Sequence, residues 1–192
     1  MTLLILGLVL FIGVHSTRAV ADGWRGSMIA KLGEGPWKGM VSVLSLVGFV
    51  LLVYGYGVAR TDPVVLWNPP IWTRHVAALL TIPAFILLAA AYVPRNRIKA
   101  AIGHPMILGT KVWALAHLLA NGNLADLLLF GGFLVWAVFA FRAARRRDRA
   151  AGTRYPSGPA SLTLVTIAVG LVAWAAFAFA LHGWLIGVQP FG

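Results

Sequence analysis

Long uncharged stretches run through most of the chain, and they constrain its fold more than any other feature. Each stretch is rich in leucine, alanine and valine, and the charged residues gather between them. A helix that crosses a membrane needs about 20 mostly apolar residues, so we predict an all-α protein, a polytopic membrane bundle of about six transmembrane helices. The predicted helices are Thr2–Thr17, Gly39–Ala59, His75–Pro94, His104–Ala120, Leu124–Phe141 and Ser161–Val188.

The composition leaves little room for anything besides these helices. Of 192 residues, 60% are hydrophobic and 11% are charged, whereas a soluble domain is about half apolar and a quarter charged. We therefore predict a single integral membrane domain over residues 1–192, with the lipid bilayer as its main partner. The chain has no cysteine, which excludes disulfides, thiolate metal sites, iron–sulfur clusters and cysteine nucleophiles.

The basic residues predict an orientation for the bundle. In a chain that crosses the membrane six times, successive helix ends lie on opposite faces. Of the 16 lysines and arginines, all but Arg60 and Arg74 then lie on one face. The positive-inside rule assigns that face to the cytoplasm, so both termini lie outside. A net charge of +11 is also compatible with a protein that binds nucleic acid. However, the run of arginines after Phe141 directly follows a predicted transmembrane helix. We interpret it as a topology anchor and predict no nucleic-acid partner.

The first stretch has a second interpretation, as a cleaved signal peptide. Ala19-Val20-Ala21 resembles a small-residue cleavage site. Against this, no basic residue precedes the apolar run, and Arg18 lies just before the site. Tryptophans near predicted outer ends, at positions 67, 72 and 184, agree with a membrane-spanning arrangement, since indole rings prefer the interface.

Histidines are the polar side chains within or beside these stretches that most need an explanation, because polar groups inside a membrane are costly. Paired carboxylates, a glycine-rich phosphate loop and a positioned hydrolase triad are not evident in the sequence. Any chemistry is therefore expected to belong to histidine and to what histidine binds. The five histidines are His15, His75, His104, His117 and His182.

The segment 103–122, GHPMILGTKVWALAHLLANG, is the most informative in the sequence. Its His-Pro, glycine, tryptophan, second histidine and Asn-Gly resemble the signature of the NnrU family of bacterial membrane proteins, which includes the plant zeta-carotene isomerase. The resemblance extends to the N-terminal helix with His15 and Arg18, and so covers nearly the whole chain. It implies a multi-span fold in the bacterial inner membrane that binds haem b.

The resemblance further implies that His15 and His117 are the axial haem ligands. Helix geometry allows the pair, since their predicted depths in the membrane differ by about 10 Å. Haem propionates favour cationic partners, for which Arg18 and Lys111 are candidates, although snorkelling explains Lys111 equally well.

The other histidines are held in reserve as ligands or explained without a cofactor. His75 is the first reserve ligand. His104 is a further reserve, but it precedes Pro105 at a helix start, where it can equally cap the helix or face water. His182, near Trp184, is interpreted as an interfacial polar residue.

Several functions are compatible with this sequence. The first is a haem protein of the NnrU type, which the resemblance links to nitrite and nitric oxide respiration, through nitric oxide reductase function or its maturation with other respiratory membrane proteins. The second is a haem-dependent cis–trans isomerase of a carotenoid or polyene. The ligand would be gaseous in the first case and hydrophobic in the second.

For the isomerase, Ala114 stands where the plant enzyme has a cysteine, which argues against redox ligand switching.

Two further functions rank below these. A membrane methyltransferase of the isoprenylcysteine type ranks lowest, since no glutamate follows Glu34. An assembly factor without a cofactor remains a further alternative.

Overall fold

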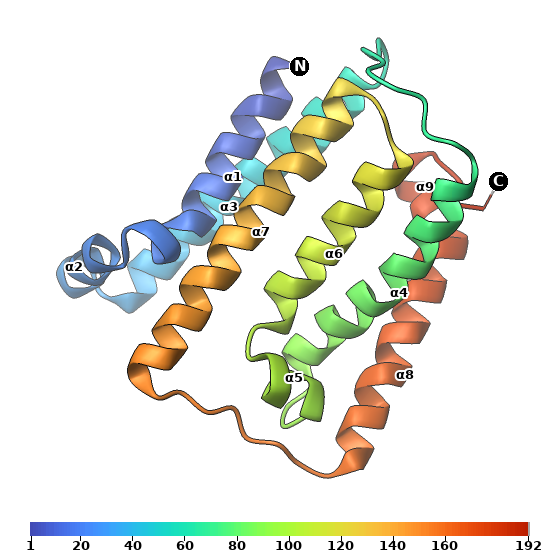
Figure 1. Ribbon diagram of the computed structural model, residues 1–192. Helices are drawn as coiled ribbons and strands as arrows, with labels where there is room; N and C mark the ends of the chain where they lie inside the picture. Colours follow the sequence, from blue (N-terminus) through green and yellow to red (C-terminus); the bar gives the residue numbers. More distant parts are fainter. Residues whose placement is uncertain (192) are drawn as a thin grey trace.

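The computed structural model describes residues 1–191, which form a bundle of helices (Figure 1). In this part of the chain, five helical stretches are long and apolar enough to cross a membrane. The predicted all-α fold is thereby confirmed, and the five candidate spans agree with a polytopic membrane bundle. The five stretches are α1 (Thr2–Val20), α3 (Glu34–Ala59), α4 (Trp72–Tyr92), α7 (Leu124–Ala151) and the continuous stretch Ala160–Ile186, which begins with α8 (Ala160–Ala176).

A sixth apolar helix, α6 (Pro105–Ala120), is shorter than the others. Its 16 residues extend about 24 Å at 1.5 Å per residue, less than the hydrocarbon thickness of about 30 Å. It lies between α4 and α7 (Figure 1). Gly103 and Gly122, beside its two ends, are buried, so the irregular backbone there is covered by protein, the setting in which a membrane protein tolerates it.

Two spans, α3 and α7, extend furthest beyond the predicted uncharged stretches. The helix predicted to end at Phe141 continues to Ala151, because alanine and arginine are strong helix formers. It ends where Gly152 adopts a left-handed conformation with φ of 61°. The helix predicted to begin at Gly39 begins at Glu34, which forms an exposed ion pair of 2.8 Å with Lys38 in its first turn.

Short helical elements connect or follow the long helices. Their sequences are charged or irregular, so they are not recognised as long uncharged stretches. Helix α2 (Asp22–Leu32) links α1 to α3, and α5 (Arg97–Ile102) precedes α6. After α8 the chain forms one π-helical turn, η1 (Phe177–Leu181), and then α9 (His182–Ile186).

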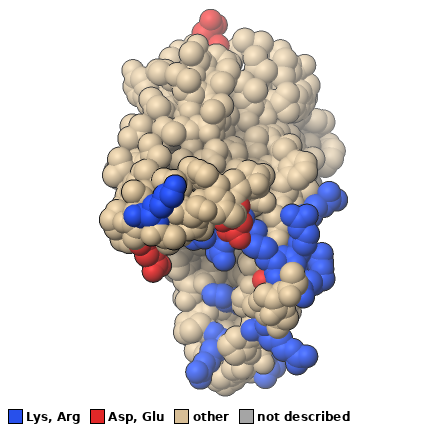
Figure 2. Space-filling view, turned by 90° about the vertical axis from the view of Figure 1, so that its left-hand side faces the viewer, with Lys and Arg blue, Asp and Glu red and all other residues tan. Residues whose placement is uncertain are grey.

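The long helices pack side by side in an order that differs from their order in the sequence. Helix α3 packs on α1, α1 on α7, α7 on α6, α6 on α4, and α4 on α8 (Figure 1). Helix α7 therefore separates α1 from α6. Both ends of the chain lie at one end of the bundle (Figure 1), and lysine and arginine side chains gather toward the other (Figure 2).

Helices α1 and α3 approach closely through glycines. A Cβ atom added at Gly7 would lie 2.7 Å from the Cα of Leu52, and one added at Gly48 would lie 2.8 Å from the backbone nitrogen of Phe11. Small residues allow helix backbones to approach in this way in membrane proteins. These two glycines therefore serve contact within the chain.

The outward faces of the bundle are apolar. Leu79 of α4 is 66% exposed, Phe139 of α7 is 63% exposed and Val172 of α8 is 70% exposed. Exposed apolar side chains on this scale are unfavourable in water and favourable against lipid tails. The surface of the long helices is therefore suited to a lipid bilayer.

Candidate functional site

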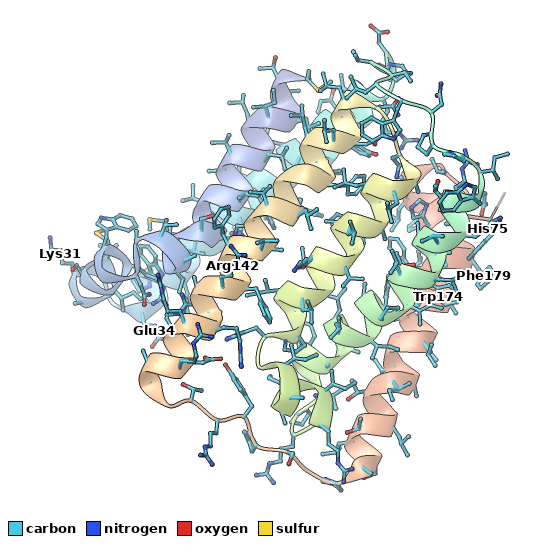
Figure 3. The ribbon with its side chains drawn as sticks, in the orientation of Figure 1. Lys31, Glu34, His75, Arg142, Trp174 and Phe179 are labelled. Atoms are coloured by element: carbon cyan, nitrogen blue, oxygen red, sulfur yellow. The ribbon has the colours of Figure 1, made fainter. Side chains whose placement is uncertain are left out.

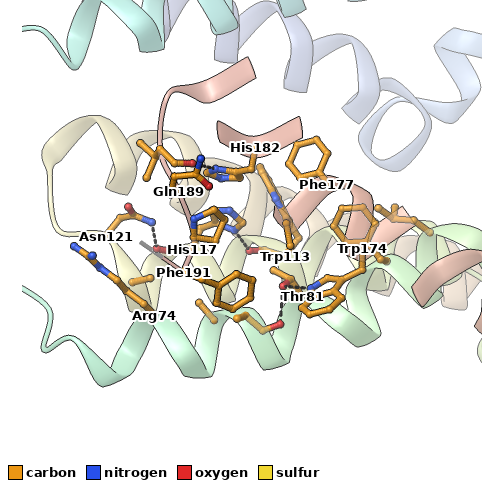
Figure 4. Close-up of a pocket in the computed structure, with 18 of the residues that line it drawn as sticks. Arg74, Thr81, Trp113, His117, Asn121, Trp174, Phe177, His182, Gln189 and Phe191 are labelled. Carbon is orange, nitrogen blue, oxygen red and sulfur yellow. Dashed lines mark hydrogen bonds between the residues drawn. The ribbon is translucent and has the colours of Figure 1, made fainter. Parts of the chain in front are cut away.

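A cavity of about 400 Å³ lies between α4, α6 and the C-terminal segment (Figure 4). Its volume is within the range of pockets that bind small molecules and cofactors. Its walls are largely aromatic and aliphatic, and side chains from α4, α6, α7, α8, η1 and α9 contribute to them. The aromatic residues of the wall are Phe85, Trp113, Phe133, Trp174, Phe177 and Phe191.

His117 of α6 lines this cavity with a fixed ring orientation. Its Nδ1 lies 2.8 Å from the carbonyl oxygen of Trp113, one helical turn earlier. A carbonyl oxygen only accepts, so Nδ1 carries a proton, and in the neutral ring Nε2 has the free lone pair. The ring also stacks on Phe130 of α7, with centroids 4.6 Å apart. An imidazole held in this way is prepared to bind a metal through Nε2.

His182 is the second imidazole in the cavity (Figure 4). It follows the π-helical turn, and its backbone N–H donates to the carbonyl oxygen of Phe177, five residues earlier. Its Nδ1 lies 2.7 Å from the carbonyl oxygen of Val188. The interpretation of His182 as an interfacial polar residue had not placed it at a site. No sequence pattern indicates its place in the cavity, because the π-helical turn and the chain that folds back after α9 bring His182 there.

Polar groups complete the lining near the end of the cavity formed by the start of α4. Arg74, in the first turn of α4, and Asn121, at the end of α6, both line it (Figure 4). Asn121 donates from its side-chain nitrogen to the carbonyl oxygen of His117 at 2.8 Å. Deeper in the cavity, the indole nitrogen of Trp174 donates to the hydroxyl of Thr81 at 3.0 Å. The cavity is therefore apolar with a few oriented polar groups.

His15 and Arg18 lie in a different part of the structure. Both line a second hollow of about 370 Å³ between α1, α2 and α3, with Arg25 and Lys38. The His15 ring stacks on Phe11 with centroids 4.3 Å apart, and its Nδ1 lies 2.7 Å from the Phe11 carbonyl oxygen. Because α7 separates α1 from α6, the structure does not bring His15 and His117 together.

The other predicted residues line neither hollow. Lys111 is half-buried on α6. His75 is exposed in the first turn of α4, at the end of the bundle that holds the termini (Figure 3). His104 occupies the position before the first turn of α6 without capping it through its side chain. The cavity thus gathers one of the four predicted histidines, His117, and adds His182.

His104 instead belongs to a polar cluster at the arginine-rich end of the bundle. Its Nε2 lies 3.0 Å from a carboxylate oxygen of Asp148, which Arg145 also approaches at 3.6 Å. The Tyr155 hydroxyl donates to the other oxygen of Asp148 at 3.1 Å. Burial raises the pKa of Tyr155, and the hydrogen bond to Asp148 raises it further. The cluster ties the start of α6 to the end of α7.

The Asn-Gly turn after α6 is held by the loop between α3 and α4. The carbonyl oxygen of Gly122 accepts hydrogen bonds from the backbone nitrogens of Leu66 at 2.8 Å and Trp67 at 3.1 Å. A side chain at Gly122 would collide with the Trp67 backbone. The turn therefore fixes the end of α6, one turn beyond His117.

The buried Asp126 stabilises the same region. It is 2% exposed, and it accepts hydrogen bonds from the Tyr56 hydroxyl at 2.6 Å and from the Asn123 backbone at 3.1 Å. Asp126 lies in the first turn of α7, and its burial and its partner on α3 are not evident from the sequence. This carboxylate cross-links α7 to α3 beside the Asn-Gly turn.

The sequence model of the family described as NnrU protein matches residues 3–190. The chain belongs to the NnrU family. Comparison with curated proteins and with solved structures gave no match. The resemblance inferred from segment 103–122 is thereby confirmed over nearly the whole chain.

Residues of the NnrU signature lie in different parts of the fold. Trp113, His117 and Asn121 line the cavity. His104 belongs to the polar cluster at the arginine-rich end. The first group can act on a bound molecule, whereas the second fixes the helix that carries the first.

Proposed function

We propose that this NnrU protein binds haem b in the cavity between α4, α6 and the C-terminal segment, with His117 as an axial ligand. The observation that carries the proposal is the His117 imidazole, whose Nδ1 is bound to the Trp113 carbonyl and which lines an aromatic cavity. A backbone carbonyl bound to Nδ1 fixes the tautomer and raises the basicity of the ligating nitrogen. Aromatic walls provide apolar surface, which favours a flat apolar macrocycle.

The chain's own residues would hold such a group in three ways. His117 supplies the ligating nitrogen, and Asn121 and Trp113 hold the end of α6 that carries it. Phe85 and Phe177, whose rings lie 5.7 Å apart, contribute apolar surface from α4 and η1. Arg74 provides a cation for a propionate carboxylate, because a guanidinium binds carboxylates strongly.

Bound haem supplies an iron that takes up small gaseous ligands and transfers single electrons, with properties set by its axial ligands and surroundings. We place this activity in nitrite and nitric oxide respiration, as the resemblance implies, in nitric oxide reductase function or maturation. We further propose that α6 counts as a sixth crossing and that the protein resides in the bacterial cytoplasmic membrane with both termini outside. The basic residues gathered away from the termini support that orientation (Figure 2).

The haem proposal is tested on protein purified in detergent. We expect a Soret band in the wild-type protein and loss of most haem in His117→Ala. His75→Ala serves as the matched control, since His75 is exposed and lies outside the cavity lining. Haem retained at wild-type level in His117→Ala with an unchanged Soret band would show that α6 does not supply the ligand.

A deletion strain tests the respiratory role. Loss of nitric oxide reduction with normal pigments supports it, whereas accumulation of a cis polyene would favour the isomerase. In this chain Ala114, at the position of the isomerase cysteine, is fully buried among leucine and phenylalanine side chains and does not line the cavity.

A further inference from the structure

From the placement of His182 we infer that this residue, rather than His15, is the second axial ligand of the group bound by His117. The inference rests on the proposed haem function. His117 belongs to α6 and His182 to α9, and both line the same cavity, which His15 does not (Figure 4). A second ligand must reach the same iron, so a residue separated from His117 by α7 is poorly placed.

The His182 imidazole has the same preparation for metal binding as His117. Its Nδ1 lies 2.7 Å from the Val188 carbonyl oxygen, so in the neutral ring Nδ1 carries the proton and Nε2 has the free lone pair. Ligating histidines almost always bind a carbonyl, carboxylate or water through their other nitrogen. Two histidines in one cavity therefore share the arrangement expected of ligands.

The backbone directly before His182 departs from a regular α-helix. The π-helical turn Phe177–Leu181 inserts one extra residue directly before it, and Phe177, Ala178 and His182 all line the cavity. Such turns occur most often at functional sites, since they change the direction of the side chains that follow.

Contacts on both sides hold this segment in place. Arg60, at the end of α3, donates to the carbonyl oxygen of Ile186 at 2.9 Å. Phe191 stacks on Phe179 with centroids 5.1 Å apart. His182 is thus positioned by contacts made before any ligand binds, which lowers the cost of binding.

The coordination of the haem iron tests this inference without any measurement of activity. With two imidazole ligands, we expect ferric wild-type protein to be six-coordinate and low-spin by absorption and electron paramagnetic resonance. His182→Ala is expected to retain haem through His117 and to become high-spin. Added imidazole should restore the low-spin spectrum, which distinguishes a lost ligand from a loosened C-terminal segment.

His15→Ala is the matched control and is expected to stay low-spin. A low-spin spectrum in His182→Ala, or a high-spin spectrum in His15→Ala alone, would overturn the assignment of His182 while leaving haem binding intact. A high-spin wild-type spectrum would also overturn it. Wild-type protein that takes up no haem would overturn the proposed function and this inference together.

Discussion

His117 and His182 line one cavity, and each binds a main-chain carbonyl oxygen through Nδ1, at 2.8 Å to Trp113 and 2.7 Å to Val188. The two carbonyls belong to different kinds of backbone, a regular helix and the segment that folds back after α9. In the neutral rings both contacts leave Nε2 with a free lone pair. The cavity therefore offers two ring nitrogens in a largely apolar setting.

Filling the cavity is predicted to weaken haem binding without disturbing the bundle. Ala78→Trp adds a large side chain to the cavity wall, and we expect haem affinity to fall about tenfold, the factor for about 1.4 kcal/mol of overlap. Leu79→Trp is the control, since Leu79 is 66% exposed on the outward face of the same helix. Haem titration measures both variants, and equal loss in the two would contradict the location of the site.

Asp148 is predicted to stabilise the fold and not to affect haem. Asp148→Asn weakens its contacts with His104, Arg145 and Tyr155, at a cost of about 1–3 kcal/mol of unfolding free energy. Thermal unfolding in detergent measures the loss. Asp22→Asn, at an exposed ion pair with Arg25, should have little effect. A normal melting temperature for Asp148→Asn would show that the cluster contributes nothing.

Tyr155 is predicted to make stability fall at alkaline pH. Burial and the hydrogen bond to Asp148 raise its pKa in the folded chain. The folded chain therefore keeps this proton when the unfolded chain has lost it, so the stabilisation is complete below about pH 10 and is lost as pH rises through the raised pKa.

Unfolding measured from about pH 9 to about pH 11 should show a shallower decline in Tyr155→Phe than in the wild type. Tyr54→Phe is the control, because Tyr54 is 64% exposed on α3. An identical decline in wild type and Tyr155→Phe would contradict the prediction.

The contact between α1 and α3 is predicted to fail when Gly7 is enlarged. Gly7→Leu places a side chain against the backbone at Leu52, and overpacking costs about 1–3 kcal/mol or more. Gly13→Leu on the same helix is the control, since nothing lies within 4 Å of a Cβ added there. Yield of folded protein and melting temperature are the measurements. Equal behaviour of the two variants would mean that the helices do not pack at Gly7.

Reporter fusions test the orientation. Alkaline phosphatase, which is active only outside the cytoplasm, should be active when fused after position 191. A fluorescent protein inserted between α7 and α8, near Gly152, should fluoresce in the cytoplasm. The reverse pattern would contradict the positive-inside assignment.

The positions of the apolar helices were predictable because a charge inside a membrane is costly, so uncharged stretches mark crossings directly. The lateral order of the helices was not predictable in this way. Lipid-facing and protein-facing positions are both apolar, so α1 and α6 carry no pattern that places α7 between them. The depth comparison for His15 and His117 concerned only the membrane normal and gave no information about their separation within the plane.

The candidate site was predictable only where local sequence positions it. His117 lies in a regular helix within the signature, and the cavity does include it. His182 depends on a π-helical turn and on a contact with Val188 after the chain folds back. Both features arise from tertiary packing, which composition and spacing do not reveal.

An experimental density map of the purified wild-type protein with its native cofactor tests the central claim most directly. The account predicts a flat macrocycle between α4, α6 and the C-terminal segment, with its iron bonded to His117. A macrocycle in the hollow beside His15, or a cavity at His117 that holds no tetrapyrrole in protein shown to contain haem, would contradict it.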